Sequence, residues 1–491
     1  MSLNPNFPLM VPIQRKNHHL MWRAGFGPAA EQLEQLKEIH PSELYKALQK
    51  ASSKKPEFIN VADNYLKGLM MGIDDVAKQS KKDLDKEDKK AIRQKQRDSI
   101  KNLNLTWIDE MVNSNAQLRE KMSLFWHGHF ASRNINVFYQ QDLLDVVRSN
   151  ALESFRDLLH GVSKSAAMLN FLNANQNRKG HPNENFAREV MELFTLGRGN
   201  YTENDIKEVA RAFTGWGANV KGEFIFRKFQ HDDGSKTVFE KTGNLSGEDV
   251  LDLLLERKET AQFITKKIYR YFVNETIDVT KVNWLADRFY KNDYHIGKLM
   301  EDIFTSDWFY DEKNIGVRIK SPIELVAGIQ RMLPMKLNNN ESLLLVQRVL
   351  GQILFYPPNV AGWPGGKTWI DSSTLMFRLR LPQLFSDKDE LNIAPKTDDD
   401  QMMGNGEAKA KNKMGKLSKG IEVDIDWNVY TNKFQSTPRE NLATALTETL
   451  FQVKTSLNGN TLKNFIDESG RDSFIRSATI QLMSTPEYQM C

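Results

Sequence analysis

The chain has 491 residues, of which 40% are hydrophobic and 26% are charged, an ordinary composition for a globular protein with a large core. The formal net charge of +4 is small for this length, so it gives no reason to expect nucleic acid or an anionic membrane as the main partner. Cys491 is the one cysteine, which excludes an intrachain disulfide, a cysteine-rich zinc site, an iron–sulfur cluster and covalently attached c-type haem.

The first residues lack the basic and apolar runs of a signal peptide, and no stretch of about 18 apolar residues follows. We therefore expect a cytoplasmic protein without a membrane span, although the lack of a visible leader does not exclude export. No P-loop, Rossmann glycine pattern, HExxH or GxSxG motif occurs, so neither nucleotide binding nor serine hydrolysis is expected.

The predicted fold is mainly α: a large irregular helical domain with at most a small β-hairpin and long loops rich in Pro, Gly and Trp. Residues 17–50 indicate short helices. Residues 76–105 are dense in Lys, Asp, Gln and Arg, which indicates a charged arm or a solvated helix more than a partner-binding segment. From about residue 105 the apolar spacing becomes helical, with Leu118, Met122 and Phe125 at intervals of four and three.

The later part of the chain continues in this style. Sequences that begin at Thr202 and Ser246 resemble helix-start capping boxes, with Asp in place of the usual Glu. The Phe-Ile-Phe alternation within residues 223–241 predicts the one hairpin. Residues 386–420 include a Lys-rich stretch almost without apolar residues and predict a disordered insert or, as an alternative, a basic tether. This gives a main domain over 1–385 and C-terminal helices over 421–491 that pack back on it.

Two histidines, His127 and His129, are separated by one residue. On an extended backbone both side chains point the same way and can converge on one metal ion, whereas on a continuous helix they point about 200° apart. Gly128, which follows an apolar helix, indicates that the helix ends here and so favours convergence. The alternative is a pair of capping or hydrogen-bonded histidines beside a packed Trp126.

Residues 178–197 read as a turn followed by an amphipathic helix. Pro182 suits the first helical turn, and Gly197 suits the end of the helix. His181 then lies at the N-terminal end of the helix, where the neutral form of its ring is favoured.

Three charged residues of this helix, Glu184, Arg188 and Glu192, are spaced by four and share one face. If that face is exposed, they form an ion-pair ladder of modest value. If it faces inward beside His181, the carboxylates can bind a metal ion or serve as acid and base.

Further candidate residues lie in two loops. His231 and Asp232 precede a turn at Gly234 and are metal-capable, although in isolation such a sequence is usually just a loop. Residues 357–370 hold Pro, Gly and Trp at spacings that exclude a helix or a central strand, so they form a structural lid or a ligand wall, with Asn359 and Trp363 as candidate pocket residues.

Two pairs of cations, Arg318 with Lys320 and Arg378 with Arg380, could face carboxylates or an anionic ligand. Taken singly, each of these four residues is more typical of a solvated charge at a helix end.

Several of these segments together resemble one family. Residues 19–27 (HLMWRAGFG), 124–130 (LFWHGHF), 179–197 (KGHPNENFAREVMELFTLG) and 357–366 (PPNVAGWPGG) are similar to blocks of the bacterial "domain of unknown function" family numbered eighteen hundred. Further similar blocks are YTE at 201–203, AFTGW at 212–216, the His231–Asp232 pair and STPEYQ at 484–489. The chain departs from the family pattern at Gly128, where Asn is common, and in the insert. The resemblance implies no particular reaction, but it implies a partner, because members are often encoded beside a second uncharacterised, sulfatase-like family.

The leading hypothesis is a metal-dependent enzyme, a hydrolase or an oxidoreductase, that uses Zn, Fe or Mn. The metal ligands would be His127, His129, His181 and either His231 or Asp232. Glu184 would be a further ligand or the general base, with Glu192 orienting it and Arg188 beside them.

Two alternatives remain. One is a non-catalytic scaffold that binds a partner protein through the loop at 357–370 and the basic tether at 386–420. In this alternative the polar motifs form a buried hydrogen-bond network. The other is binding of a glycan or another small polar ligand against Trp126, Trp363 and Trp369.

Overall fold

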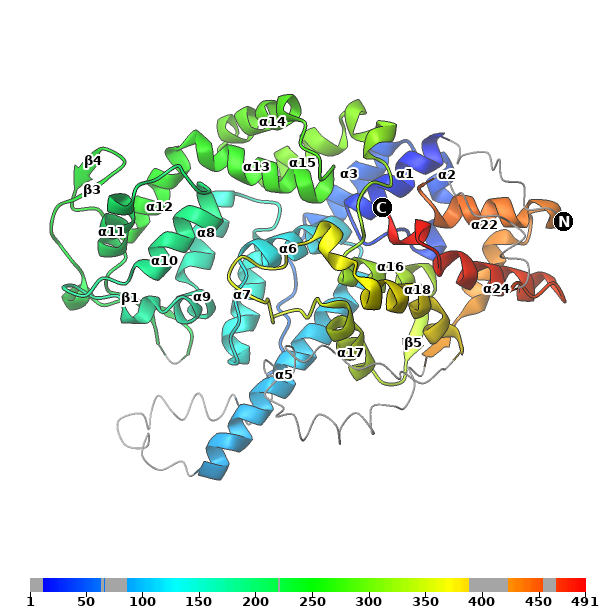
Figure 1. Cartoon of the computed structure of the whole chain (residues 1–491), viewed down its shortest axis with the longest axis horizontal. Helices are drawn as coiled ribbons and strands as arrows, with labels where there is room; N and C mark the ends of the chain where they lie inside the picture. The colour runs from blue at the N-terminus through cyan, green and yellow to red at the C-terminus, as the bar shows by residue number, and fades with distance from the viewer. Residues whose placement is uncertain (1–11, 63–65, 67–85, 220, 388–422, 454–464) are drawn as a thin grey trace.

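A computed structural model describes residues 12–62, 66, 86–219, 221–387, 423–453 and 465–491 of the chain. Helices make up most of this part of the protein, as Figure 1 shows, and the predicted mainly α class is confirmed. None of the helices described is long and apolar enough to cross a membrane.

The helices fall along the whole chain. The first half holds α1 (Pro12–Arg23), α2 (Gln35–Glu38), α3 (Pro41–Ser52), α5 (Lys86–Asn113), α6 (Gln117–His129), α7 (Val137–Ser149), α8 (Phe155–Lys164), α9 (Ala166–Phe171), α10 (Glu184–Glu189), the π-helix η3 (Val190–Thr195) and α11 (Glu203–Ala212). The second half holds α12 (Gly247–Glu256), α13 (Lys258–Phe272), α14 (Val279–Lys291), α15 (Ile296–Phe304), α16 (Pro322–Met332), α17 (Glu341–Leu350), α18 (Ser372–Asp387), α21 (Trp427–Thr431), α22 (Leu442–Leu450) and α24 (Arg471–Met483).

Three small antiparallel sheets of two strands each occur in the described ranges. They pair β1 (Trp216–Ala218) with β2 (Phe224–Phe226), β3 (Lys236–Val238) with β4 (Lys241–Gly243), and β5 (Met335–Leu337) with β6 (Val423–Ile425). The prediction of a single hairpin was therefore too low. The tight turn between β3 and β4 puts Phe239 and Glu240 at positive φ (49° and 68°) without the Asn-Gly signature that usually marks such a turn.

Both predicted capping boxes are confirmed. The Thr202 side chain accepts a hydrogen bond from the Asp205 backbone at the start of α11, and Asp205 returns a bond to the Thr202 N–H. Ser246 and Asp249 do the same at the start of α12. Asp replaces Glu in both boxes because its shorter carboxylate still reaches the N-cap N–H, at 2.8 Å in each.

The segment 178–197 differs from the single helix that was predicted. Asn183 caps the start of α10, whose helical backbone begins at Glu184 rather than at Pro182. The chain then continues as a π-helix from Val190 to Thr195, and Gly197 follows with φ of 77°. π-Turns inside helices expose backbone carbonyls to other partners and are frequent at functional sites.

Helix α6 is the central element of the molecule. Every residue from Gln117 to His129 except Gly128 is buried. Its side chains enter two apolar cores: Met122 and Trp126 pack with α8 to α15, and Leu124 packs with α5, α16 to α18 and the C-terminal helices. A helix buried on all sides cannot show the amphipathic pattern of a surface helix.

The two composition-based segments lie partly outside the described residues. Of the charged segment 76–105, residues 86–105 belong to α5, whose N-terminal half is mostly exposed and extends away from the other helices (Figure 1). Residues 76–85 lie outside the described ranges, as does most of the predicted insert, since the described chain stops at 387 and resumes at 423. Helices α22 and α24 share the second core with α5 and α16.

Candidate functional site

An open surface pocket of about 870 Å³ lies where two of the predicted segments meet. It is lined by Asn175, Gln176, Arg178, His181, Pro182, Asn183, Glu184 and Gln230. Of the predicted site residues, the structure thus brings His181 and Glu184 together. The loop that holds His231 supplies the neighbouring wall through Gln230. We call this cavity the polar pocket.

A tight turn forms the first wall of the polar pocket. Arg178 and His181 form an isolated bridge, and the His181 N–H donates to the Arg178 carbonyl at 2.9 Å. Gly180, the third residue of the turn, has φ of 79°, and no other atom lies near the position a Cβ would take. A positive φ here is the reason for glycine, since other residues are strained in this region. The turn holds both side chains at the rim.

The buried amide of Asn177 fixes this turn to the body of the protein. Its oxygen accepts from the Asn183 N–H at 2.9 Å, and its nitrogen donates to the Ala210 carbonyl at 2.8 Å. The Asn177 carbonyl accepts in addition from the Gly215 N–H at 3.0 Å. A single side chain therefore sets the start of α10 relative to α11.

The second wall is the short 3₁₀ turn η4 (Lys228–Gln230) and the loop after it. The Lys179 N–H donates to the Gln230 carbonyl at 2.7 Å, which joins the two walls. The His231 ring is buried, and its Nδ1 donates to the Thr214 carbonyl at 2.8 Å, so this ring points away from the pocket and into the fold.

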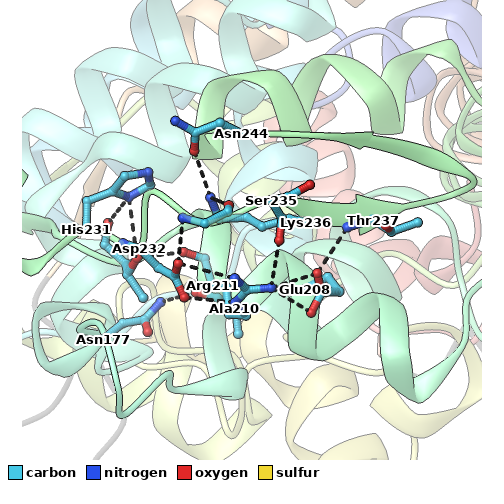
Figure 2. A network of polar contacts seen from close by, with 12 residues as sticks. Asn177, Glu208, Ala210, Arg211, His231, Asp232, Ser235, Lys236, Thr237 and Asn244 are labelled. Atoms are coloured by element: carbon cyan, nitrogen blue, oxygen red, sulfur yellow. Dashed lines mark hydrogen bonds and ion pairs between the residues drawn. The ribbon is translucent and has the colours of Figure 1, made fainter.

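Asp232 faces an arginine instead of solvent. Figure 2 shows its carboxylate bound by Arg211, with 2.8 Å to Nε and 3.2 Å to Nη2. This hydrogen-bonded arginine lowers the pKa of Asp232 to about 2. Glu208 binds the same guanidinium at 2.9 and 3.0 Å, so Arg211 is held between two carboxylates. The network stiffens the loop behind the pocket and leaves Asp232 engaged.

Lys236 closes the far side of the same network. Its ammonium donates to the Gly234 carbonyl at 3.0 Å. It also donates to the Asn244 amide oxygen at 3.2 Å, as Figure 2 shows. Burial lowers the pKa of Lys236. This lysine thus ties the β3–β4 hairpin to the loop that carries Asp232.

Unpartnered polar groups distinguish the polar pocket from these networks. Within the described ranges the side chains of Arg178, His181 and Gln230 have no protein partner. Glu184 uses one oxygen, Oε2, which accepts from Arg188 at 3.3 Å. The pocket therefore presents a cation, an imidazole, a carboxylate and an amide to solvent.

The three residues of the predicted charged face divide into different contacts. Arg188 binds both oxygens of Glu203, at 2.9 and 3.0 Å, as well as Glu184, and the Glu203 hydrogen bonds raise the pKa of Arg188. Glu192 accepts from the Tyr201 hydroxyl at 2.6 Å and pairs with Arg198; the hydrogen bond from Tyr201 is the larger cause of its lowered pKa. Only Glu184 of the three lines the pocket.

His127 and His129 lie on opposite sides of α6, because the helix runs through Gly128 instead of ending there. The expected extended segment was wrong. The His127 Nε2 accepts from the Phe355 N–H at 3.1 Å, and burial lowers the pKa of His127 to about 3. Across the described residues, no three His, Cys, Asp or Glu side chains gather as metal ligands would.

His129 joins α6 to the π-helix. Its Nε2 donates to the Phe194 carbonyl at 3.2 Å, while its Nδ1 accepts from the Lys267 ammonium at 3.0 Å. Lys267 donates in addition to the Leu193 carbonyl at 3.1 Å, and burial lowers its pKa to about 8. The carbonyls of η3 are thus capped by two side chains that come from α6 and α13.

The three candidate ligand-binding residues, Trp126, Asn359 and Trp363, differ in exposure. Trp126 is fully buried, and its Nε1 donates to the Ala151 carbonyl at 3.1 Å, which makes it a core residue. Trp363 is half-buried against His127, with 5.6 Å between ring centroids, and Asn359 is exposed, with its side chain bonded to the Ala361 N–H. Trp363 and Asn359 both lie in the loop of residues 357–370, which we call the aromatic loop. This loop packs on the end of α6, because a Cβ at Gly362 would lie 2.2 Å from the Gly128 oxygen.

The family model described as "Protein of unknown function (DUF1800)" matches residues 19–490. The chain belongs to this family. Comparisons with curated proteins and with solved structures gave no match. The matched range includes both walls of the polar pocket, α6 and the aromatic loop.

Sequence reasoning missed Arg178, Gln230 and Lys267. The first two flank the predicted motifs, and the only signal for them is their position beside a turn. Lys267 sits in the unremarkable helix α13, and nothing in its sequence neighbourhood shows that it meets a histidine 138 positions away. Contacts between distant helices cannot be read from local periodicity.

Proposed function

We propose that this protein binds a small, negatively charged polar ligand in the polar pocket and hydrolyses it, with His181 and Glu184 as the proton-exchanging groups. The observation that supports this most is the set of pocket side chains without a protein partner, Arg178, His181 and Gln230, in the described part of the chain. Pockets with a few convergent polar groups are the usual sites of small ligands.

The chemistry of the lining residues favours an anion. The Arg178 guanidinium matches the geometry of a carboxylate or phosphate group, which it can bind through two parallel N–H bonds. Histidine is the residue type best suited to exchange protons near neutral pH. The second oxygen of Glu184 has no partner among the described residues and can accept a proton from a bound water or substrate hydroxyl.

A divalent ion, Zn, Fe or Mn, belongs to this proposal as an ion held by His181 and Glu184. An imidazole nitrogen and a carboxylate oxygen are suitable ligands for such ions. The other candidate ligands, His127, His129, His231 and Asp232, are not included, because each is hydrogen-bonded within the protein. The ion would polarise the bond to be cleaved and activate water.

A ligand screen tests the proposal. Saturation-transfer NMR with phosphate esters, sulfate esters and dicarboxylates is expected to find binders, and Zn²⁺ or Mn²⁺ titration by calorimetry is expected to show one site. Arg178→Ala is expected to weaken ligand binding at least tenfold, corresponding to about 1.4 kcal/mol. Its matched control is Arg198→Ala, since Arg198 is exposed and lies outside the pocket.

His181→Ala and Glu184→Gln are expected to abolish metal binding and to lower turnover of any hydrolysed hit by about 10²-fold or more. Equal weakening by Arg178→Ala and Arg198→Ala would contradict binding in the pocket. If His181→Ala still binds the metal ion, the ion is not held by His181 in this pocket.

A second function, a scaffold that acts with a sulfatase-like partner protein, is favoured by one observation. His127, His129 and Asp232 all form bonds inside the fold, as expected of polar motifs that fix helix packing. Co-expression with the neighbouring sulfatase-like protein, followed by size-exclusion chromatography, tests it: a shared peak supports the scaffold, and separate peaks contradict it.

A further inference from the structure

Five cationic side chains from four distant segments lie together inside the protein, close enough that each of them interacts electrostatically with Glu324. Arg23 ends α1, Lys121 lies on α6, Arg318 and Lys320 precede α16, and Arg378 lies on α18. All five are buried: Arg318 is 6% exposed, and the other four have no exposed surface. Sequence reasoning favoured solvated helix ends for Arg318, Lys320 and Arg378, and burial shows that this was wrong. We call this group the buried cation cluster.

One carboxylate, Glu324, lies within the cluster. It pairs with Lys121 through a short contact and with Arg318 Nη2 at 3.4 Å. The Ser321 N–H donates to it as well, at 2.7 Å. Burial opposes its ionisation, but Arg318 and Lys121 outweigh burial and hold the pKa of Glu324 well below its usual range. Glu324 therefore neutralises one of the two cations that it contacts.

The other three cations donate to backbone and amide oxygens, and the negative charge at Cys491 acts on Arg23. Arg23 donates to the carbonyls of Asn314 at 3.1 Å and Cys491 at 2.9 Å. Arg378 donates to the Lys320 carbonyl and to the Gln489 amide oxygen.

Lys320 donates to the Tyr488 carbonyl and lies between two aromatic rings. Its ammonium is 3.6 Å from the ring centroid of Trp22 and 3.7 Å from that of Tyr488. Burial lowers the pKa of Lys320 to about 7, so the cluster gives up part of its charge at this residue.

Several hydrogen-bond donors of the cluster have no acceptor. In the described part of the structure, the buried atoms without a partner include Nε and Nη1 of Arg23, Nη1 of Arg318, Nη1 of Arg378 and the hydroxyl of Tyr271. The Arg318 guanidinium lies over the Tyr271 ring, 4.6 Å from its centroid. All four guanidinium atoms can only donate, so acceptors are what the cluster lacks.

The balance of charge points the same way. Three negative charges act on the cluster, those of Glu324, Cys491 and Glu275, against its five cations. Buried charges without a partner are costly, by several kcal/mol per ion in real proteins. An anion that accepts several hydrogen bonds at once would satisfy both deficits.

We propose that the buried cation cluster binds a small oxyanion of the phosphate or sulfate class inside the protein, with Arg23, Arg318 and Arg378 as its principal ligands. Guanidinium groups bind such oxyanions through paired N–H bonds, and a tetrahedral anion has enough acceptor oxygens for three of them. This site is separate from the polar pocket and rests on different residues.

Anion release from the wild-type protein is the first test. The protein, purified without phosphate or sulfate, is denatured and the filtrate is analysed by ion chromatography. In parallel, melting temperatures are recorded with phosphate, with sulfate and with NaCl of equal ionic strength. We expect either about one oxyanion released per chain or a saturable rise of several degrees that NaCl does not reproduce. Neither effect in the wild type would overturn the proposal.

Variants locate the effect. Arg378→Gln is expected to weaken the anion response at least tenfold. Arg331→Gln is the matched control, because Arg331 is equally buried but donates to the Gly27 and Val112 carbonyls. Arg178→Ala in the polar pocket is expected to leave the response unchanged. A response that survives Arg378→Gln, or that Arg178→Ala removes, would overturn the assignment to the cluster, and the wild-type release measurement decides even if Arg378→Gln fails to fold.

Discussion

At the scale of single residues, His127 shows how a polar side chain can be structural. Its ring accepts the Phe355 N–H and packs edge-on against Trp107 and Phe355, at centroid distances of 5.2 and 4.9 Å. Phe355 itself has φ of 67°, which costs energy in a residue with a side chain. His127 thus stabilises a strained backbone position two residues before the aromatic loop.

We expect His127→Ala to lower the free energy of unfolding by about 2–4 kcal/mol, because it leaves a buried N–H without an acceptor and opens a cavity. Urea denaturation measures this. His181→Ala is the comparison, and since His181 is exposed, its effect is expected to stay within about 0.5 kcal/mol. Similar losses in both variants would show that His127 is not a structural residue.

The two histidines of α6 also show what the sequence could not decide. Their motif was identified, but its geometry depends on whether Gly128 ends a helix. Gly128 faces open space, since no atom lies within 4 Å of a Cβ built there, so the helix continues without strain. The apolar partners that hold it, such as Phe155 and Phe355, come from distant segments. By contrast, the His181–Glu184 pair follows a local turn, and its place at one site was predictable.

At the scale of elements, the aromatic loop is docked on the end of α6 through Gly362. A Cβ at this position would lie 2.2 Å from the Gly128 oxygen, and φ is 78°. Gly351, which follows α17, has a similar φ of 83° in the left-handed region, with ψ of 20°, but open space around it. The two glycines therefore share the cost of positive φ and differ in the steric contact.

We expect Gly351→Ala to cost about 1 kcal/mol from backbone strain alone. Gly362→Ala is expected to cost about 2 kcal/mol more, because the loop must move away from α6. Thermal melting gives the difference, and faster proteolysis within residues 357–366 of Gly362→Ala reports the displaced loop. Equal melting temperatures for the two variants would mean that the loop does not pack on α6 as described.

The elements themselves were the most predictable level. The capping boxes at Thr202 and Ser246 predict the starts of α11 and α12 correctly, because a cap is formed by residues close together in the sequence. The π-helix after Glu189 was not foreseen, because its carbonyls are held by His129 and Lys267 from other helices. Lys320 and Arg378 illustrate the same limit, since nothing near them in the sequence signals burial.

At the scale of the whole molecule, four buried histidines make the fold sensitive to acid. Burial is the largest cause in each: it lowers the pKa of His18 to about 4, that of His127 to about 3, and those of His19 and His129 well below 6.5. Because the folded pKa lies below the unfolded value, this stability is complete above pH 6.5 and is lost as the pH falls.

Between pH 6.5 and 5.5 the unfolded chain takes up to four more protons than the folded one, each worth about 1.4 kcal/mol per pH unit. Asp142 opposes this by at most one proton, since burial raises its pKa to about 6. We expect a net fall in the free energy of unfolding over this range, measured by urea denaturation at several pH values. His127→Gln should reduce the slope by about one proton, and a flat profile would show that the buried histidines do not govern it.

The pairing of β5 with β6 joins residues 335–337 to residues 423–425, and α18 and α24 contact each other across the same gap in sequence. The part of the chain before residue 388 therefore contacts the part after residue 422 directly. A chain severed anywhere in that interval would still consist of two pieces with matching strands and a shared core. We expect the two pieces, produced in the same cells, to associate through these contacts, which their co-purification would test.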